Sequence, residues 1–274
     1  MTRVACAQIN VAFNDPAKNV DRAVQVLQAA QANGTDLVVF PECFLTGYCV
    51  STPEDADAIC IELQSSAIEA LCEECASLGV HAVVGFARRA NGRRYNSAVL
   101  IEPNKTVHCY DKTHLPELGL DRFVTRGEAL PLFRTEIGAI GVLVCFDLRH
   151  PEATRVLALK GAELIVLPTN WPEGAYAAPE FIASARAAEN RVFLATCNRI
   201  GEENGYRFIG RSAIYSVGGR PLAQAGENED VVTADIDLTE ARSKRSVIRL
   251  GEYEITMFES RRPELYGELT DPIQ

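Results

Sequence analysis

The stretch DLVVF, residues 36–40, is a short, continuous apolar run with turn-forming residues on both sides: Asn33-Gly34 before it and Pro41 after it. A run of this kind is typical of a strand that is buried on both faces. Residues 20–32, just before it, repeat their apolar side chains at helical spacing, and Asn33-Gly34 is a common way to end a helix. A helix followed by a buried strand is the repeating unit of an α/β protein.

The same alternation continues along the chain and predicts one α/β domain over residues 1–274, with a mixed sheet covered by helices. No linker rich in Pro or Ser and no internal repeat interrupts it, and residues 238–274 form a more polar C-terminal tail. We expect a hairpin from Ser97–Ile101 and Lys105–Tyr110. The other expected strands are Val4–Ile9, His81–Phe86, Ile140–Val144, Glu163–Leu167, Val192–Cys197, Phe208–Tyr215 and Val231–Ile236, and the expected helices are Ala56–Leu78, Pro151–Lys160 and Pro179–Asn190.

The composition excludes some classes of function. The chain has 47% hydrophobic and 23% charged residues, which is ordinary for a globular protein, and a net charge of -10. That charge argues against a general nucleic-acid binder, because phosphate affinity needs clustered Lys and Arg. No apolar run approaches the roughly 20 residues that cross a bilayer, and the opening MTRVACAQINVAF does not resemble a signal peptide. We therefore expect a cytoplasmic protein that does not bind membranes.

The nine cysteines are scattered through apolar or helical stretches, and their odd number argues against a disulfide framework. Most of them are expected to be small buried apolar residues. Cys72 and Cys75 form a C-x-x-C pair, which could hold zinc or act in redox chemistry. No second pair and no neighbouring His completes such a site. We expect no metal and no cofactor.

Several polar or nucleophilic residues directly follow predicted strands. Glu42, Lys112, Cys145, Asn170 and Trp171 each stand just beyond such a strand. In open α/β folds, ligand sites form beyond the carboxyl ends of strands, so these residues could meet in one pocket. Each alone has an ordinary explanation, because a Glu often caps a helix, a Lys is usually a surface charge and a Cys after an apolar strand usually belongs to the core.

Three segments carry a resemblance to a known family. PECFLTGY (41–48), YDKTHLP (110–116) and GVLVCFDLRHPE (141–152) resemble the glutamate, lysine and cysteine motifs of the nitrilase, or carbon–nitrogen hydrolase, family, in the same order and at comparable spacing. The resemblance extends over nearly the whole chain. It also includes VACAQIN, KGAELIVLPTNWP, RAAENRVFLATCNRIGEE and FIGRSAIYSVGG.

The resemblance implies that Cys145 is the nucleophile, Glu42 the general base and Lys112 the positive charge that stabilises an oxyanion, together with the backbone N–H of Phe146. The chemistry agrees with these residue types. A free thiol with a pKa near 8.5 is mostly protonated at neutral pH, so it needs a base, and a buried carboxylate has a raised pKa that suits this role.

The resemblance also implies a second carboxylate and residues that line the substrate pocket. Family members carry a second glutamate after the lysine motif, and in ELGLDRFVTRGE either Asp121 or Glu117 could take its place. Tyr48 and Trp171 are expected to line the substrate pocket with Phe146 and Asn170, although Trp171 could equally be a core aromatic residue.

The histidines leave a second mechanism open. His114 and His150 lie inside the motifs, so a Cys–His pair is the alternative to a glutamate base. We favour a structural role for His114 beside Lys112, and we expect Arg186 and Glu189 to support the site rather than to contact substrate.

The resemblance implies an α-β-β-α sandwich that pairs with a second copy as a homodimer or larger assembly, with the tail 238–274 contacting the partner. The expected activity is hydrolysis of a small linear amide or N-carbamoyl compound to a carboxylate and ammonia. FDLRHPE after Cys145 resembles the amidase and carbamoylase branches and lacks the Trp-Glu pair of nitrilases. Nitrile hydrolysis is the alternative within the same chemistry. A catalytically idle regulatory or binding protein of this fold and an acyltransferase are further alternatives.

Overall fold

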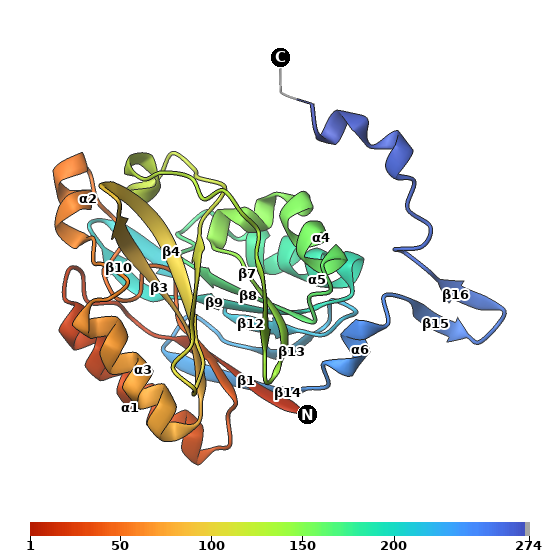
Figure 1. Cartoon of the computed structure of the whole chain (residues 1–274), viewed down its shortest axis with the longest axis horizontal. Coiled ribbons are helices and arrows are strands. Elements are labelled where there is room, and N and C mark those ends of the chain that lie inside the picture. The colour runs from red at the N-terminus through yellow and green to blue at the C-terminus, as the bar shows by residue number, and fades with distance from the viewer. Residues whose placement is uncertain (272–274) are drawn as a thin grey trace.

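A computed structural model describes residues 1–271 and has two six-stranded mixed sheets packed face to face (Figure 1). Helices α1 (Pro16–Ala32) and α3 (Ser66–Leu78) cover the outer face of one sheet, and α4 (Pro151–Leu159) and α5 (Ala183–Asn190) cover the other. This α/β fold with an α-β-β-α layering confirms the fold class expected from the sequence.

The first sheet has the strand order β14-β1-β2-β3-β4-β5. Its central strands β1, β2 and β3 run parallel, while β14, β4 and β5 are antiparallel to their neighbours. The expected hairpin is present as β4 and β5. The strands are β1 (Thr2–Gln8), β2 (Leu37–Val39), β3 (His81–Ala90), β4 (Arg93–Ile101), β5 (Val107–Asp111) and β14 (Asp230–Ile236).

The second sheet has the order β13-β12-β9-β8-β7-β6, again with a parallel centre of β7, β8 and β9. The outer strands β6, β12 and β13 are antiparallel to their neighbours. Both sheets therefore place the carboxyl ends of three parallel strands side by side. The strands are β6 (Leu132–Thr135), β7 (Gly138–Val142), β8 (Leu164–Thr169), β9 (Phe193–Asn198), β12 (Ala213–Tyr215) and β13 (Pro221–Gln224).

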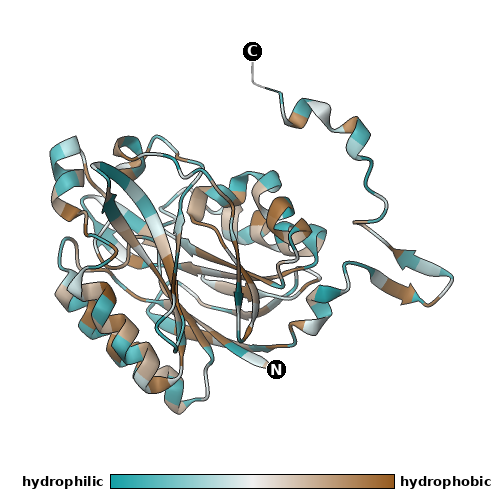
Figure 2. Cartoon of the chain, viewed as in Figure 1, coloured by the Kyte–Doolittle hydropathy of each residue, from teal (hydrophilic) through white to brown (hydrophobic). Residues whose placement is uncertain are grey.

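Alternation along the strands divides the core into layers. In β1, Val4 and Cys6 belong to the cluster between the two sheets, whereas Ala5 and Ala7 pack with the apolar side of α1 and α3. Successive side chains of a strand point to opposite faces, so both faces of β1 are buried and the strand reads as an apolar run. Figure 2 shows the same arrangement, with hydrophobic central strands and hydrophilic outer faces on the helices.

The structure corrects the expected helix Ala56–Leu78. It is two helices, α2 (Pro53–Ile59) and α3, separated by an extended segment in which Ile61 hydrogen-bonds to the backbone of Ala87 and Arg89 at the edge of β3. Helical periodicity continues across the gap, but those backbone bonds to β3 replace the helical ones. Among the helices of residues 1–271, none has the length and hydropathy that crossing a membrane requires.

The expected strand Phe208–Tyr215 is also wrong in its extent. Gly210 and Arg211 both have left-handed backbone conformations, with φ of 62° and 61°, and these break the strand into two. The first half, β11 (Tyr206–Ile209), pairs with β10 (Ile200–Glu203) in a separate hairpin, and only β12 joins the second sheet. The expected helix Pro179–Asn190 is present as a π-helical turn, η3 (Ala178–Ile182), followed by α5.

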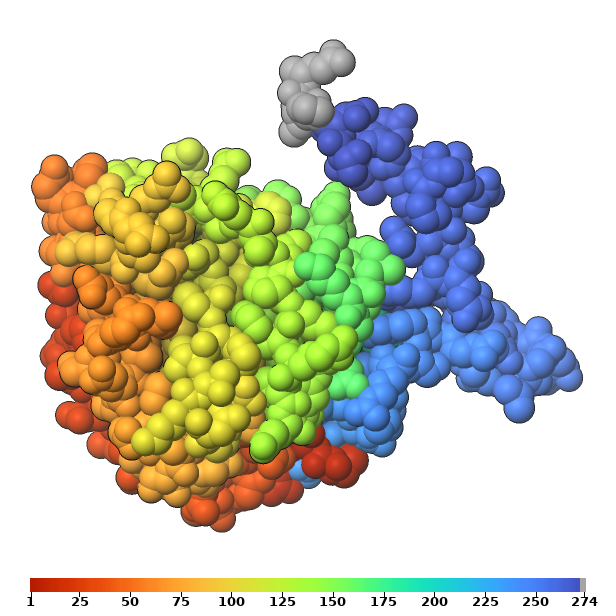
Figure 3. Space-filling model, in the orientation of Figure 1, coloured from red at the N-terminus to blue at the C-terminus, as the bar shows by residue number. Residues whose placement is uncertain are grey.

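The C-terminal tail forms an arm that projects beyond the two sheets (Figure 1 and Figure 3). Its Phe258 packs against the core cluster and lies under the Arg155 guanidinium of α4. A short helix, α6 (Thr239–Arg242), joins the arm to the body. Beyond that helix follow a two-stranded hairpin and two short turns of 3-10 helix. These elements are β15 (Ser246–Arg249), β16 (Tyr253–Ile255), η4 (Pro263–Leu265) and η5 (Gly267–Leu269).

Candidate active site

Glu42 lies in the loop that follows β2, where the sequence places it, and its carboxyl group is buried. Gly85 in β3 permits this position. A Cβ atom at Gly85 would stand 2.5 Å from the Cys43 nitrogen and 2.8 Å from the Glu42 Cα, so only glycine lets the loop pack this close to the strand. The fold therefore holds the Glu42 backbone directly against the neighbouring strand.

Lys112 follows β5 and joins two carboxylates. Its backbone N–H donates to the Asn96 carbonyl at 2.8 Å, which continues the pairing of β4 and β5 by one residue. Its Nζ donates to Glu42 Oε1 at 2.7 Å and to Asp121 Oδ2 at 2.6 Å, and all three side chains are buried. Two carboxylates and one ammonium thus form a compact buried cluster.

Asp121 rather than Glu117 lies beside Lys112. Asp121 is on the short helix η1 (Gly119–Phe123), and Glu117 is exposed. Gly119, with φ of 49°, lets η1 pack tightly on Tyr48, because a Cβ there would stand 2.7 Å from the Tyr48 ring. Tyr48 donates its hydroxyl to Asp121 Oδ2 at 2.8 Å. The shorter Asp side chain reaches Lys112 because η1 lies close to the cluster.

The electrostatics of the cluster follow from its burial. Burial raises the pKa of Glu42 above its ordinary value, and the Lys112 ammonium and the Asn96 amide offset part of this effect. Burial acts to lower the pKa of Lys112, but Asp121 and Glu42 outweigh it and hold that pKa well above its ordinary value. Lys112 therefore stays charged, while Glu42 can exchange a proton at a pH closer to neutrality than an exposed carboxyl group does.

Cys145 stands at a sharp turn between β7 and α4. Its φ of 45° is a left-handed conformation that costs a residue with a side chain about 1–3 kcal/mol. Asp147 stabilises the turn from both sides. Its Oδ2 accepts from the Val144 N–H at 2.9 Å, and its own N–H donates to the Val144 carbonyl at 3.0 Å.

The Cys145 thiol holds its proton strongly. Burial and the nearby Glu42 carboxylate raise its pKa to about 12, against a smaller lowering by Lys112, the Thr169 side chain and the backbone N–H of Asn170. The thiol is therefore protonated at neutral pH. Glu42 and Lys112 are close enough to act on the thiol, as are Thr169 and Asn170 at the end of β8.

Four buried polar atoms near the thiol have no hydrogen-bond partner within residues 1–271: Glu42 Oε2, Thr169 Oγ1, Asn170 Oδ1 and Asn170 Nδ2. A buried polar atom without a partner is costly, about 1–3 kcal/mol each, and rare in native proteins. Such atoms are common where a ligand supplies the missing bond. Glu42 and Asn170 are both at strand ends next to Cys145, which is where a substrate would lie.

The remaining predicted pocket residues surround this point. Tyr48 is buried with its hydroxyl on Asp121, and Phe146 is half-buried directly after Cys145. Trp171 is 4% exposed and packs in the core cluster between the sheets, so its side chain is largely a core residue. Its backbone N–H donates to Asn198 Oδ1 at 2.8 Å.

The two motif histidines form a stack. The rings of His114 and His150 lie 3.9 Å apart, and His114 Nδ1 lies 2.7 Å from Asp147 Oδ1. Asp147 also accepts from the Tyr110 hydroxyl at 2.7 Å. Asp147 therefore ties the residues on both sides of Lys112, Tyr110 and His114, to the turn that carries Cys145. Arg186, expected to support the site, donates to the Leu148 carbonyl at 3.1 Å on the same turn.

Sequence reasoning missed several residues that hold the site together. Asn96 bridges Glu42 and Asp121, and Asp147 fixes the Cys145 turn. Glu203 accepts from the backbone N–H of Tyr48 at 2.7 Å. Its other oxygen pairs with the buried Arg199. The signal for Asn96 was a polar residue inside the predicted strand region YNSAV, and for Asp147 its place two residues after Cys145, but a sequence does not show which partners such residues meet.

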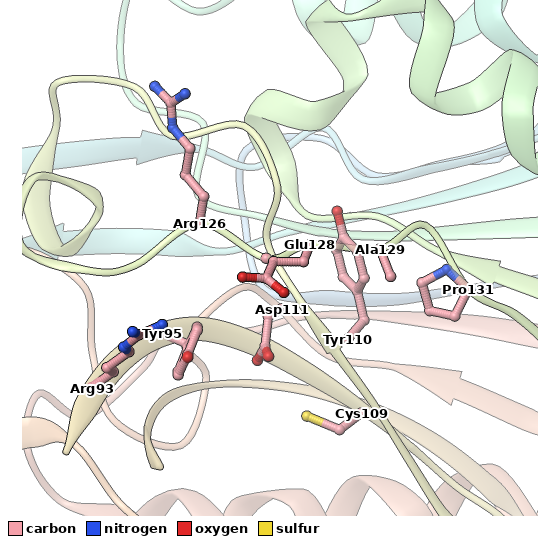
Figure 4. Close-up of a pocket in the computed structure, with 10 residues that line it drawn as sticks. Arg93, Tyr95, Cys109, Tyr110, Asp111, Arg126, Glu128, Ala129 and Pro131 are labelled. Atoms are coloured by element: carbon pink, nitrogen blue, oxygen red, sulfur yellow. The ribbon is translucent and has the colours of Figure 1, made fainter. Parts of the chain in front are cut away.

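A separate cavity of about 330 Å³ lies at the outer edge of β5 (Figure 4). Arg93 and Tyr95 on β4, Asp111 on β5, and Arg126 and Glu128 on the following loop contribute to its lining. Its lining does not include Glu42, Lys112, Asp121 or Cys145. Within residues 1–271, no group of three or more His, Cys, Asp or Glu side chains is arranged to hold a metal ion.

Comparison with known proteins agrees with this geometry. The chain is 36% identical to a nitrilase from Pyrococcus abyssi (strain GE5 / Orsay), over 97% of this chain and 99% of that protein. It is 31% identical to an (R)-stereoselective amidase from Pseudomonas sp., over 98% and 94% of the two chains. Among solved structures, an amidase from Nesterenkonia sp. AN1 superposes with a TM-score of 0.81 at 25% identity, over 98% of this chain and 100% of that one.

A variant of that amidase carries the acetamide moiety of fluoroacetamide covalently at its active-site cysteine; it is 25% identical, covers 97% and 95% of the two chains, and has a TM-score of 0.79. The family model described as carbon-nitrogen hydrolase matches residues 3–246 of this chain. That range contains every clustered residue described above. The chain therefore belongs to the carbon–nitrogen hydrolase family, the nitrilase superfamily, whose members include amidases and nitrilases.

Proposed function

We propose that this protein hydrolyses the carbon–nitrogen bond of a small linear amide or N-carbamoyl compound through a thioester on Cys145. Glu42, Lys112 and Asp121 complete the catalytic group. The observation that carries the proposal is the buried cluster in which a carboxylate with one unpaired oxygen, a charged ammonium and a thiol converge. It matches the division of roles in nucleophilic catalysis, where a base and a fixed charge serve one nucleophile.

In the first half of the reaction, Glu42 Oε2 takes the thiol proton while the Cys145 sulfur attacks the substrate carbonyl carbon. A base is required because the thiol, with a pKa of about 12, is otherwise protonated at neutral pH. Lys112 and the backbone N–H of Phe146 stabilise the oxyanion that forms. Glu42 then gives the proton to the leaving nitrogen, the carbon–nitrogen bond breaks, and ammonia departs from a thioester.

In the second half, Glu42 removes a proton from water, and the resulting hydroxide attacks the thioester carbon. The carbon–sulfur bond breaks, the sulfur takes the proton back from Glu42, and a carboxylic acid is released, which loses its proton to the solvent or to the ammonia. Glu42 thus acts as base and then as acid in each half of the reaction, which a buried carboxylate with a raised pKa is suited to do. Asp121 keeps Lys112 charged and in place throughout.

The substrate contacts are assigned to Tyr48, Phe146, Asn170 and Trp171. The support for Asn170 is its buried carboxamide, in which neither polar atom has a partner within residues 1–271. Such a group can donate one hydrogen bond to the substrate and accept another. Trp171 contributes through its backbone and its position after Asn170 more than through its ring, which is in the core.

A nitrile is the second candidate substrate, and the similarity to the Pyrococcus abyssi nitrilase favours it. The same thiol attack on a nitrile carbon gives a thioimidate, which water converts to the thioester and ammonia. The chemistry of the cluster therefore serves both substrates. An assay of ammonia release with short aliphatic amides, ω-amides, N-carbamoyl amines and nitriles decides between them.

In that assay, the amide proposal predicts turnover of an amide or carbamoyl compound with a higher kcat/KM than any nitrile of equal chain length. Higher kcat/KM for the nitriles would make the protein a nitrilase. Absence of turnover across the panel, together with the absence of an adduct on Cys145, would leave an idle regulatory or binding protein of this fold.

We also propose that the chain forms a homodimer or larger homo-oligomer through its C-terminal arm. The arm exposes large apolar side chains, with Ile248 58% and Leu250 81% exposed on the hairpin and Leu265 62% and Leu269 64% exposed beyond it. Phe258 packs the arm against the body, but these apolar side chains stay exposed, and a cluster of exposed apolar groups marks a surface for association. The partner is a second copy of the chain.

A further inference from the structure

We propose that Asn96 is a positioning residue that selects which oxygen of Glu42 acts as the base. Asn96 is buried on β4, and its Nδ2 donates to Glu42 Oε1 at 2.7 Å and to Asp121 Oδ1 at 2.9 Å. One amide group therefore bridges both carboxylates of the cluster. This inference rests on the proposed role of Glu42 as base.

The two donors on Glu42 bind the same oxygen. Lys112 Nζ and Asn96 Nδ2 both donate to Oε1, each at 2.7 Å, and Oε2 has no partner within residues 1–271. A carboxylate that receives two strong bonds on one oxygen keeps its other oxygen free to accept a proton. Without Asn96, the carboxyl group could rotate and share the Lys112 bond between its oxygens. Asn96 thus fixes the free oxygen.

The orientation of the Asn96 amide is itself fixed. Its Oδ1 accepts from the Cys43 thiol at 3.4 Å, next to Glu42 in the chain. The reversed orientation would place Oδ1 against two carboxylate oxygens, which repel it. The main chain takes part as well, because the Asn96 carbonyl accepts from the Lys112 N–H at 2.8 Å. Asn96 therefore contacts Glu42, Lys112 and Asp121 at once.

This arrangement has a measurable consequence for the base. A hydrogen bond to the charged form of a carboxyl group favours that form, so the Asn96 bond acts to lower the pKa of Glu42. Loss of the bond should raise that pKa and move the acidic limb of the pH profile to higher pH. Every variant keeps the other titratable groups that face Glu42, which are Cys43, Tyr48, Lys112, Asp121 and Cys145.

The experiment measures the rate of Cys145 alkylation by iodoacetamide from pH 4 to about pH 9, by mass spectrometry of the Cys145 peptide, in wild type, Asn96→Ala and Asn96→Asp. In this reaction a carbon–sulfur bond forms, iodide leaves and Glu42 takes the thiol proton. Asn96→Ala should shift the acidic midpoint up by about one pH unit, the tenfold effect of one strong bond to a charged group. Asn96→Asp, of the same shape but with a third carboxylate, should shift it further.

The matched control is Asn19→Ala. Asn19 is a buried asparagine on α1 that also makes two donated bonds, to the carbonyls of Ala12 at 2.7 Å and Leu45 at 3.1 Å. It should lower the unfolding midpoint in urea and leave the alkylation midpoint at the wild-type pH. If both Asn96 variants also keep the wild-type midpoint, Asn96 is only a structural residue and the inference is wrong.

Alkylation does not depend on the identity of the substrate, so it separates this inference from the proposed function. In Glu42→Gln, the midpoint should disappear, because the rate then follows the thiolate fraction of Cys145 and rises over the whole pH range without a plateau. If the midpoint stays in Glu42→Gln, the assignment of Glu42 as base is wrong, whatever Asn96 does. If the midpoint disappears in Glu42→Gln and the Asn96 variants shift it in the order given, the inference holds even when no amide of the panel is hydrolysed.

Discussion

Lys112 donates a hydrogen bond to only one oxygen of Glu42, at 2.7 Å, and leaves the second oxygen of that buried carboxyl group without a partner within residues 1–271. An ion pair built for stability would satisfy both oxygens, since an unpartnered buried oxygen costs about 1–3 kcal/mol. This pair instead combines a charge that stays fixed with an oxygen that is free to take a proton. The predictions below follow from that combination.

Glu42→Gln should abolish most of the activity and leave the fold intact. Gln has the same shape and keeps a carbonyl oxygen for Lys112, but it cannot take the thiol proton. General base catalysis contributes about 10²–10⁴-fold, so kcat/KM should fall by that factor. The measurement is ammonia release on the best substrate of the panel, with circular dichroism as the check on folding. Wild-type kcat/KM in a folded Glu42→Gln protein would exclude Glu42 as the base.

Lys112→Met should destabilise the protein. Both carboxylates of the cluster lose their cation while they stay buried, and breaking a buried ion pair on one side costs about 3–5 kcal/mol. Without the ammonium, nothing offsets the effect of burial on the pKa of Glu42 except Asn96, so its carboxyl group is protonated more readily in the folded state than in the unfolded state. The stability that protonation supplies is present at low pH and lost as pH rises, so the loss in urea unfolding should be larger at pH 8 than at pH 5.

Lys105→Met is the control for Lys112→Met. Lys105 pairs with Glu73 at 2.7 Å on the surface, where both side chains are at least half exposed. Surface pairs of this kind contribute about 0–1 kcal/mol, so this variant should unfold close to wild type at both pH values. Equal effects of the two substitutions would contradict the buried, charged state of Lys112.

The pH profile of kcat/KM should have an acidic limb whose midpoint lies above 4.5, the ordinary value for Glu, because burial raises the pKa of Glu42. The rate rises with pH along this limb, since the base must lose its proton before it can accept one from the thiol. No alkaline limb should appear below about pH 10, because the pKa of Lys112 is raised well above its ordinary value and that of Cys145 is about 12. A bell-shaped profile centred near neutral pH would favour the Cys–His alternative.

The apolar runs and strand-end residues predict much of the fold and part of the buried cluster. Glu42 and Cys145 follow the buried strands β2 and β7, which belong to the parallel centres of the two sheets. Lys112 follows the half-buried edge strand β5, which is antiparallel to β4, so the parallel-strand rule does not account for its position. The choice between Asp121 and Glu117 depended on the packing of η1 against Tyr48, which the local sequence does not specify.

The expected helix Ala56–Leu78 and the expected strand Phe208–Tyr215 were each predicted as one element, but the structure breaks each of them in two. The break at Ile61 comes from backbone bonds to β3, and the break at Gly210 and Arg211 comes from two consecutive left-handed residues. Asn96 and Asp147 were missed for a related reason. Each of them acts through a partner that is distant in the sequence. Asn96 bonds to Glu42, 54 residues away, and Asp147 bonds to Tyr110, 37 residues away.

Ile248→Glu combined with Leu250→Glu should prevent self-association. These two side chains are exposed on the hairpin of the C-terminal arm, and charge at both positions opposes burial against a second copy. Sedimentation should give a multiple of the 29.9 kDa chain mass for wild type and 29.9 kDa for the double variant. Tyr206→Glu, at an exposed residue on the β10–β11 hairpin, is the control and should sediment as wild type. A monomeric wild type would remove the proposed dimer.

The identity of the nucleophile is the central claim, and covalent trapping tests it most directly. The protein is mixed with the best substrate of the panel and quenched in acid, and its peptides are mapped by mass spectrometry while ammonia is measured in parallel. We predict the acyl group on the Cys145 peptide in wild type, and neither acyl group nor ammonia release with Cys145→Ala. Ammonia release at the wild-type rate from Cys145→Ala, or an acyl group on another of the nine cysteines, would contradict this account.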